Sequence, residues 1–271
     1  HASADETEVQ GNSFSNSKGI SFSGSGELDN GWTVSTTYSM TNAAFSTSQV
    51  TIDMGDQGTV GLWNNASGAG INKYQDMMPT AGEQVWDDSD TDDNGIVGHE
   101  NENMLGYNGS FGGIGLSLAY VNGGAGGKDG GASDSSWVVT YDGLMDGLSL
   151  GVGQGENGTT SDLSTAYVKY TAGSITVGYQ FSEIENAQGT ADEESRHLAA
   201  SIAVNENLSV SAGRFEVDMG AGTVDEESTG FSASYTMGGS TIGFVANSTE
   251  NVAGTANSDD SYREISVSFA F

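Results

Sequence analysis

The chain has 271 residues, of which 41 are Gly, 1 is Pro and none is Cys, and its 37 acidic side chains against 7 Lys and Arg give a formal net charge of −30. The lack of Cys excludes a disulfide scaffold and a thiolate metal site, and the acidic balance argues against nucleic-acid binding, which needs clustered Lys and Arg. Only 35% of residues are hydrophobic and no run of ~18 apolar residues occurs, which excludes a membrane-spanning helix but not membrane-spanning strands of ~9–11 residues.

Apolar residues recur along the chain with a period of two, which predicts β-strands. The last strand shows the pattern best, with Ile265, Val267, Phe269 and Phe271 on one face and Glu264, Ser266, Ser268 and Ala270 on the other. The alternation predicts fifteen strands, at about 18–28, 31–41, 48–55, 58–64, 104–110, 113–122, 135–143, 147–155, 163–171, 174–184, 195–205, 207–217, 229–237, 240–248 and 260–271.

The connections between these strands alternate strictly between short and long. The short ones are turns rich in Gly, Asn and Asp, as tight hairpins require. The long ones are polar and mostly acidic, at 42–47, 65–100, 122–134, 155–161, 184–195, 218–228 and 248–260. In an up-and-down barrel all short turns then lie at one rim and all long connections at the other.

The choice is between a transmembrane antiparallel barrel and a secreted β-sandwich, whose strands also alternate. Within the strands the second face carries Ser, Thr, Gly and Ala instead of the charged residues usual on a wet surface, and the charges are concentrated in the long connections. These features favour the barrel, because hydrocarbon requires a closed sheet with an apolar outer face. The expected lipid-facing set includes Tyr38, Leu116, Val177, Phe231, Val267 and Phe269.

The segment from Val50 to Trp63, with its tight Gly turn, and the terminal Phe271 behind an alternating strand resemble the general porins of Gram-negative outer membranes, most closely the Rhodobacter-like group of alphaproteobacteria. The resemblance covers the whole chain and implies one porin domain over 1–271, sixteen strands and a homotrimer. It also implies that the long loop 65–103 folds into the lumen. Since barrels of this type have an even number of strands, we expect a first strand to precede His1, with residues Thr7 to Phe14 as a poor substitute for it.

Loop 65–103 is the longest connection and carries many carboxylates. Folded inward, they would dominate a pore constriction, because rings of Asp and Glu select cations; the alternative is a solvated acidic loop outside the barrel. Lys169 shares the parity of Thr165 and Tyr167, so we expect it to face the lumen. The predicted constriction residues are Asp76, Glu83, Asp87, Asp88, Asp90, Asp92, Asp93, Glu100, Glu102 and Lys169.

The porin pattern opposes this acidic loop with a cluster of Arg and Lys on the barrel wall. The present sequence departs from it, because the strands between 18 and 64 carry no Arg and Lys only at Lys18. We therefore do not expect a transverse field across the pore. Arg196 and Arg263 border long connections and are expected to meet lipopolysaccharide headgroups, whereas Arg214 falls on the apolar parity and marks a bulge or a subunit interface.

Part of the same loop matches the ligand spacing of a calcium loop. Asp90, Asp92 and Asn94 alternate before Gly95, which corresponds to positions 1, 3, 5 and 6, and the carbonyl of Ile96 would supply position 7. Asn101 occupies position 12, so Glu100 or Glu102 would have to swing in. The alternative is a mobile acidic turn without an ion. The predicted optional cofactor is therefore Ca²⁺.

These features together predict an outer-membrane porin, a water-filled channel for passive diffusion of small hydrophilic solutes with a preference for cations. The predicted partners are outer-membrane lipid, lipopolysaccharide and two further copies of the chain. The alternatives are a substrate-specific porin and a structural or adhesion barrel. We expect no enzyme activity, because no Gly-x-Ser-x-Gly elbow or other catalytic motif accompanies His1, His99 and His197.

Overall fold

The computed structural model describes residues 3–4, 7–8, 19–41, 44–85, 96, 103–123, 132–158, 161–186, 192–220 and 222–269. No helix in these ranges is long and apolar enough to span a membrane. The elements, in chain order, are β1 Ser3–Ala4, β2 Thr7–Glu8, β3 Gly19–Glu27, β4 Thr33–Thr41, β5 Ala44–Asp53, η1 Gly55–Gln57, β6 Thr59–Asn64, η2 Ile71–Tyr74, β7 Met104–Phe111, β8 Ile114–Val121, β9 Asp134–Tyr141, β10 Leu148–Asn157, β11 Ser161–Ala172, β12 Ile175–Asn186, β13 Glu193–Ala203, β14 Leu208–Asp218, β15 Glu226–Met237, β16 Ser240–Glu250, η3 Val252–Gly254 and β17 Asp260–Phe269.

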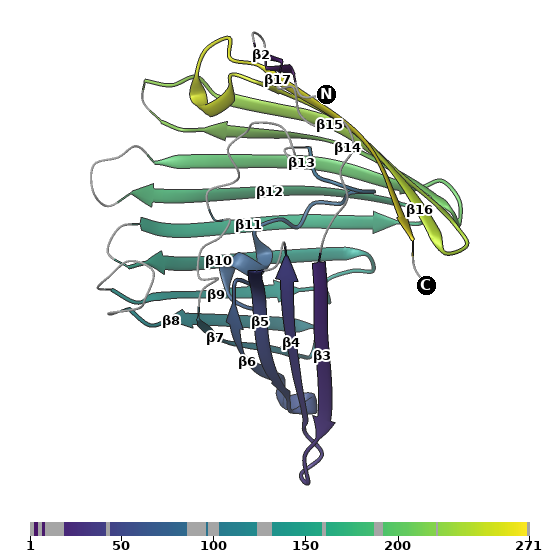
Figure 1. Ribbon diagram of the computed structural model, residues 1–271. Helices are drawn as coiled ribbons and strands as arrows, with labels where there is room; N and C mark the ends of the chain where they lie inside the picture. Colours follow the sequence, from purple (N-terminus) through teal and green to yellow (C-terminus); the bar gives the residue numbers. More distant parts are fainter. Residues whose placement is uncertain are drawn as a thin grey trace.

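One antiparallel sheet joins β3 to β17 in chain order, each strand pairing with the next, so the predicted all-β up-and-down architecture is confirmed. The sheet has fifteen strands, with β3 and β17 as its edges, and β1 pairs separately with β2. In Figure 1, β3–β6 run across the direction of β8–β13, so the sheet curves strongly. The sixteenth strand implied by the family resemblance is not in the described part of this sheet and stays a prediction.

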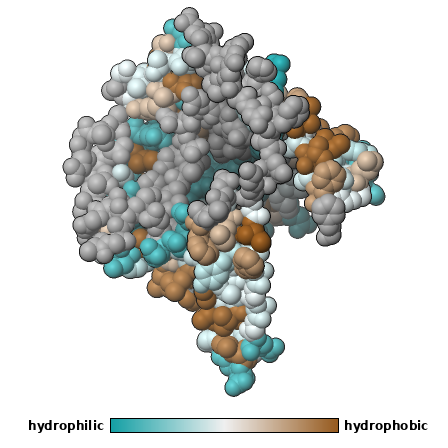
Figure 2. All heavy atoms as spheres, in the orientation of Figure 1, coloured by the Kyte–Doolittle hydropathy of each residue, from teal (hydrophilic) through white to brown (hydrophobic). Residues whose placement is uncertain are grey.

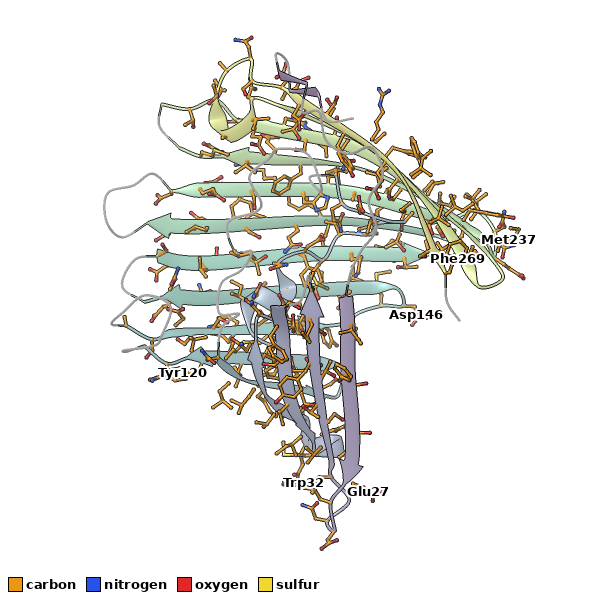
Figure 3. All side chains as sticks on the ribbon, in the orientation of Figure 1. Glu27, Trp32, Tyr120, Asp146, Met237 and Phe269 are labelled. Atoms are coloured by element: carbon orange, nitrogen blue, oxygen red, sulfur yellow. The ribbon has the colours of Figure 1, made fainter. Side chains whose placement is uncertain are left out.

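The short and long connections lie at opposite rims, as their alternation predicts. In Figure 3, Asp146, in one short turn, and Met237, the last residue before another, lie at one side of the sheet, and Tyr120, before a long connection, lies at the other. The β7–β8 turn shows why glycine is needed there. Gly112 and Gly113 have φ of 61° and 87°, the left-handed backbone that a two-residue hairpin turn requires and that L-residues rarely adopt.

Most strand positions agree with the alternation, but one predicted connection is wrong. The sequence pattern predicts a polar connection at 42–47, whereas β5 begins at Ala44 and pairs with β4 up to Thr41, the last residue of that strand. A register shift between Ser39 and Met40 absorbs an extra residue, as in a β-bulge. Bulges interrupt strict alternation, so a polar, Ser- and Thr-rich strand end with a bulge reads as a loop.

The two faces of the sheet differ as a barrel wall requires. All six residues of the expected lipid-facing set lie on the outward face by strand parity, and five of them are clearly exposed: Tyr38, Val177, Phe231, Val267 and Phe269. Figure 2 shows apolar residues gathered on the outer side of the β3–β6 part of the sheet. The inward face carries small and polar residues, together with the apolar patches that receive the segment after β6.

Candidate functional site: a strap across the inner wall

The chain after β6 crosses the inner face of the sheet. We call residues 66–85 the strap. Its backbone is held by hydrogen bonds to inward side chains on strands that lie far apart in the sheet. Four of its N–H groups donate to the wall: Gly70 to Ser117 on β8 (2.9 Å), Ile71 to Ser136 on β9 (2.8 Å), Met77 to Gln180 on β12 (2.8 Å) and Ala81 to Ser211 on β14 (2.9 Å). At the end of the strap, the side-chain amide of Asn247 on β16 donates to the carbonyl of Gln84 (3.0 Å). The described part of loop 65–103 therefore lies in the lumen, as predicted.

Gln180 is the most connected of these wall residues. Its Oε1 accepts the N–H of Met77, and its Nε2 donates to the carbonyls of Tyr74 (2.8 Å) and Gln75 (3.2 Å). The same amide nitrogen lies 3.0 Å from Oγ1 of Thr165 on the neighbouring strand, and the Gln180 side chain is only 3% exposed. One side chain thus satisfies three backbone groups that a strand ladder would otherwise pair.

Apolar side chains of the strap fill the spaces between these anchors. Ile71 packs with Val138, Leu163 and Ile184, a cluster that also contains Ile96, while Met78 packs with Tyr167 and Val85 with Phe215. At one point where the strap lies against the wall, the wall residue is a glycine. A Cβ on Gly178 would lie 2.9 Å from Sδ of Met78, so a larger residue there would push the strap away.

The structure places four of the predicted site residues and leaves the others outside the described residues. Asp76 and Glu83 lie on the strap, Lys169 faces inward on β11 with Thr165 and Tyr167, and Ile96 is buried against the wall. The remaining predicted residues lie outside the described part of the chain: Asp87, Asp88, Asp90, Asp92, Asp93, Asn94, Glu100 and Glu102.

Asp76 braces the strap internally. Its carboxylate accepts hydrogen bonds from the N–H of Met78 (3.1 Å) and from Nε2 of Gln84 (2.6 Å), and its Oδ1 lies 3.8 Å from Nδ1 of His197 on β13. This carboxylate therefore closes the bend between residues 76 and 84 besides contributing negative charge.

The start of the strap carries a base with an altered pKa. Lys73 donates to Oδ1 of Asn108 on β7 (2.9 Å) and lies over the ring of Tyr74. Desolvation lowers the pKa of the Lys73 ammonium and raises the pKa of the Tyr74 hydroxyl, to which the charge of Asp142 also contributes. Lys73 therefore loses its positive charge at a lower pH than an exposed lysine does.

The wall formed by β3–β6 carries no base toward the lumen in its described residues. Its inward positions, identified by pairing from the buried Trp63, are hydroxyl, amide or small residues, with Glu27 and Asp53 near the short turns: Ser21, Ser23, Ser25, Thr33, Ser35, Thr37, Ser39, Gln49, Thr51, Thr59 and Gly61. The strap therefore faces no basic cluster on these strands, as the sequence predicts.

Charged side chains also occupy the outer face, at the long-connection ends of β10–β16. Arg196 pairs with Glu194 and Glu216, and Arg214 pairs with Glu216 and Glu227. Arg214 sits in regular register opposite Leu198 and Thr229, so the predicted bulge at this residue is wrong and its outward orientation is confirmed. The sequence predicts that charge is concentrated in the long connections, whereas at these ends charged residues also belong to the strands.

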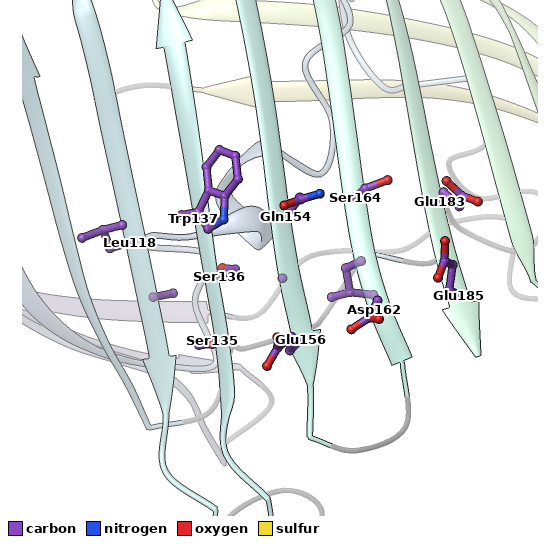
Figure 4. Close-up of a pocket in the computed structure, with 13 residues that line it drawn as sticks. Leu118, Ser135, Ser136, Trp137, Gln154, Glu156, Asp162, Ser164, Glu183 and Glu185 are labelled. Carbon is purple, nitrogen blue, oxygen red and sulfur yellow. The ribbon is translucent and has the colours of Figure 1, made fainter. Parts of the chain in front are cut away.

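A shallow hollow of about 620 Å³ lies on this outer face and is not part of the pore. Figure 4 shows Trp137, Gln154, Ser164 and Glu183 in one row of neighbouring strands, with Ser135, Glu156, Asp162 and Glu185 in the next. These residues alternate with the inward-facing Ser136 and Leu163. Small side chains make the hollow, and it lies where the apolar surface gives way to carboxylates.

Sequence analysis missed the wall residues that hold the strap, above all Gln180 and Asn247. A usable signal was present in β12, where Gln180 lies on the face opposite Val177, Tyr179 and Phe181 and is a long amide between the small residues Gly178 and Ser182. The sequence alone does not connect it to Met77, which is 103 residues away.

We predict that Gln180→Ala destabilises the protein by about 1–3 kcal/mol and exposes the strap, because the variant leaves buried backbone groups without partners. Thermal unfolding and limited proteolysis within residues 66–85 measure the two effects. Gln154→Ala is the matched control, since Gln154 lies outward on β10 and bonds no strap residue in the described structure. Equal stability and equal proteolysis of the two variants would show that Gln180 does not hold the strap.

Several solved outer-membrane proteins share this architecture. A porin refined at 1.8 Å resolution matches with a TM-score of 0.70 and 15% identity, over 93% of this chain and 92% of that one. A mutant of the Rhodobacter blastica porin matches with a TM-score of 0.64 and 15% identity, over 100% and 96% of the two chains. OmpT, an outer membrane protein of Vibrio cholerae, matches with a TM-score of 0.65 and 12% identity, over 94% and 89%. At these identities the likeness shows the fold.

Sequence comparison gives the family. A search of curated protein sequences finds no significant match. The family model described as Gram-negative porin matches residues 1–271, the whole chain. Members of this family are channels of the outer membrane and not enzymes, so the predicted location and the predicted lack of catalysis are confirmed. The chain therefore belongs to the Gram-negative porin family and is an outer-membrane porin.

Proposed function

We propose that this porin conducts small hydrophilic solutes passively and prefers cations. The observation that carries the proposal is the charge of the lumen: the strap brings Asp76 and Glu83 inside, and the described inward face of β3–β6 offers no Lys or Arg opposite them. The net charge of −30 adds to the same field. A negatively charged passage with low-dielectric walls concentrates cations and repels anions.

Reconstitution in planar bilayers tests this function. We expect ion conductance without any added ligand and a cation-selective reversal potential in a KCl gradient at low salt. The selectivity should weaken at high salt, because the Debye length shortens from ~10 Å at 0.1 M to ~3 Å at 1 M. An anion-selective reversal potential at low salt contradicts the cation preference, and a silent bilayer contradicts an open channel.

We also propose that the porin assembles as a homotrimer through its outward face on β3–β9. Every outward residue of these strands in the described structure is uncharged, and the surface includes exposed Ile20, Phe22, Phe45 and Leu62. The outward ends of β10–β16, in contrast, carry ion pairs and carboxylates, which suit contact with lipopolysaccharide headgroups. The particle mass in detergent tests the stoichiometry, and a monomeric mass would contradict it.

A calcium site in loop 65–103, after the strap, is a further part of the proposal. It is supported by the spacing of Asp90, Asp92 and Asn94 and by the position of Ile96, whose burial against the wall would anchor one end of the ion-binding turn. The residues of this loop that lie outside the described ranges include all the proposed carboxylate ligands. Glu100 or Glu102 would complete the coordination.

We predict weak calcium affinity, on the order of 10⁻⁴–10⁻³ M as in extracellular calcium modules, because Asn101 stands where the bidentate Glu of position 12 is expected. Isothermal titration of the detergent-solubilised porin measures it, with the double variant Asp90→Asn/Asp92→Asn as the test and Glu216→Gln, on the outer face, as the control. Equal calcium binding by the double variant and the wild type would show that these oxygens are not ligands.

A further inference from the structure

Glu264 on β17 faces the lumen. It pairs directly with Val245 on β16, which is 5% exposed and lies on the inner face with Asn247. Asn247 donates to the strap carbonyl of Gln84, which fixes this face as the inner one. Directly paired residues of neighbouring strands project to the same side of a sheet. The neighbouring Arg263 and Ile265 therefore point outward and Glu264 points into the channel.

Glu264 also lies at the height at which the strap crosses the wall. Pairing places Ser211, Ser232, Val245 and Glu264 in one row across β14, β15, β16 and β17. The strap sits on the first two members of this row, since Ala81 N–H donates to Ser211 Oγ and Thr80 Oγ1 lies 3.3 Å from Ser232 Oγ. With ~4.8 Å between strands, the backbone of Glu264 is ~10 Å beyond Ser232.

The surroundings of Glu264 keep its charge effective. The hydroxyl of Tyr262 donates to its Oε2, which holds the carboxylate on the inner face. No Lys or Arg faces inward on β12–β17 in the described residues, because Arg196, Arg214 and Arg263 all lie on the outward parity. Lys169 is on β11, towards its short turn, and Lys73 lies beside β7. A carboxylate that no base neutralises attracts cations into the passage.

We infer that Glu264 is a specificity-determining residue of the channel: with the strap carboxylates it sets the preference for cations, and it acts from the barrel wall beyond the end of the strap. This inference deepens the proposed function and rests on it. Because Glu264 belongs to β17, its charge would stay in the channel if the strap were moved or deleted, so part of the cation preference resides in the sheet.

The test compares Glu264→Gln with Glu216→Gln in planar bilayers at low salt. Both replace a carboxylate by an amide of the same shape, but Glu216 lies on the outer face with Arg196 and Arg214. We expect Glu264→Gln to lower the cation-to-anion permeability ratio by about twofold or more, since few charges act in the passage and screening is weak at low salt. Glu216→Gln should leave the ratio unchanged. An unchanged ratio in Glu264→Gln overturns the inference.

A cysteine variant makes the test independent of folding defects in the amide variant. The chain has no Cys, so Glu264→Cys carries the only thiol. Treating the open channel with a negatively charged methanethiosulfonate should restore the cation preference, and a positively charged reagent should reverse it. A thiol that does not react from the aqueous phase, or reaction without change in the ratio, overturns the inference.

A wild-type channel selective for anions would refute the proposed function separately. In that case the inference about Glu264 would still require Glu264→Gln to shift the permeability ratio further towards anions.

Discussion

The strap depends on hydrogen bonds between its backbone and side chains of the wall. An extended segment inside a barrel has no neighbouring strand, so its N–H and C=O groups need other partners. Here Ser117, Ser136, Gln180, Ser211 and Asn247 provide them from β8, β9, β12, β14 and β16. The inward residues that make the lumen hydrophilic are thus also the residues that fix the constriction.

Once the strap is fixed in this way, the distribution of charge in the channel follows. The strap lies on the β8–β16 side, and its carboxylates act from there, with Asp76 oriented by its own bonds to Met78 and Gln84. The β3–β6 wall presents hydroxyl groups. The described lumen thus contains the strap carboxylates and two bases, Lys73 and Lys169, but no basic cluster on β3–β6 opposite the strap. We therefore expect solutes to be attracted or repelled according to their net charge, without a transverse field that orients them.

The repeating features of this fold could be predicted from the sequence, because they follow from local patterns. Alternation located the strands, turn residues separated the short rim from the long one, and parity placed Lys169 and Val267 on the correct faces. The strand ends were less predictable. Glu193, Glu226 and Glu250 belong to strands that extend beyond the apolar surface, where alternation of hydrophobicity no longer marks the sheet.

The path of the strap could not be predicted from the residues, since it depends on contacts between distant segments. Gln84 meets Asn247 across 163 positions, and neither residue has a local pattern that indicates the other. Family resemblance supplied the expectation that the loop enters the lumen, and the anchors came from the structure. The roles of Asp87, Asp88 and Asp90 stay predictions, as these residues lie outside the described ranges.

Cross-linking the strap to the wall tests the central claim most directly. Ala81 N–H lies 2.9 Å from Ser211 Oγ, and the chain has no other Cys, so Ala81→Cys with Ser211→Cys creates one defined pair. The account predicts that the disulfide forms readily in the assembled channel and that single-channel conductance is the same before and after reduction. Failure of the pair to form, or a conductance that changes on reduction, would contradict a strap fixed at this position.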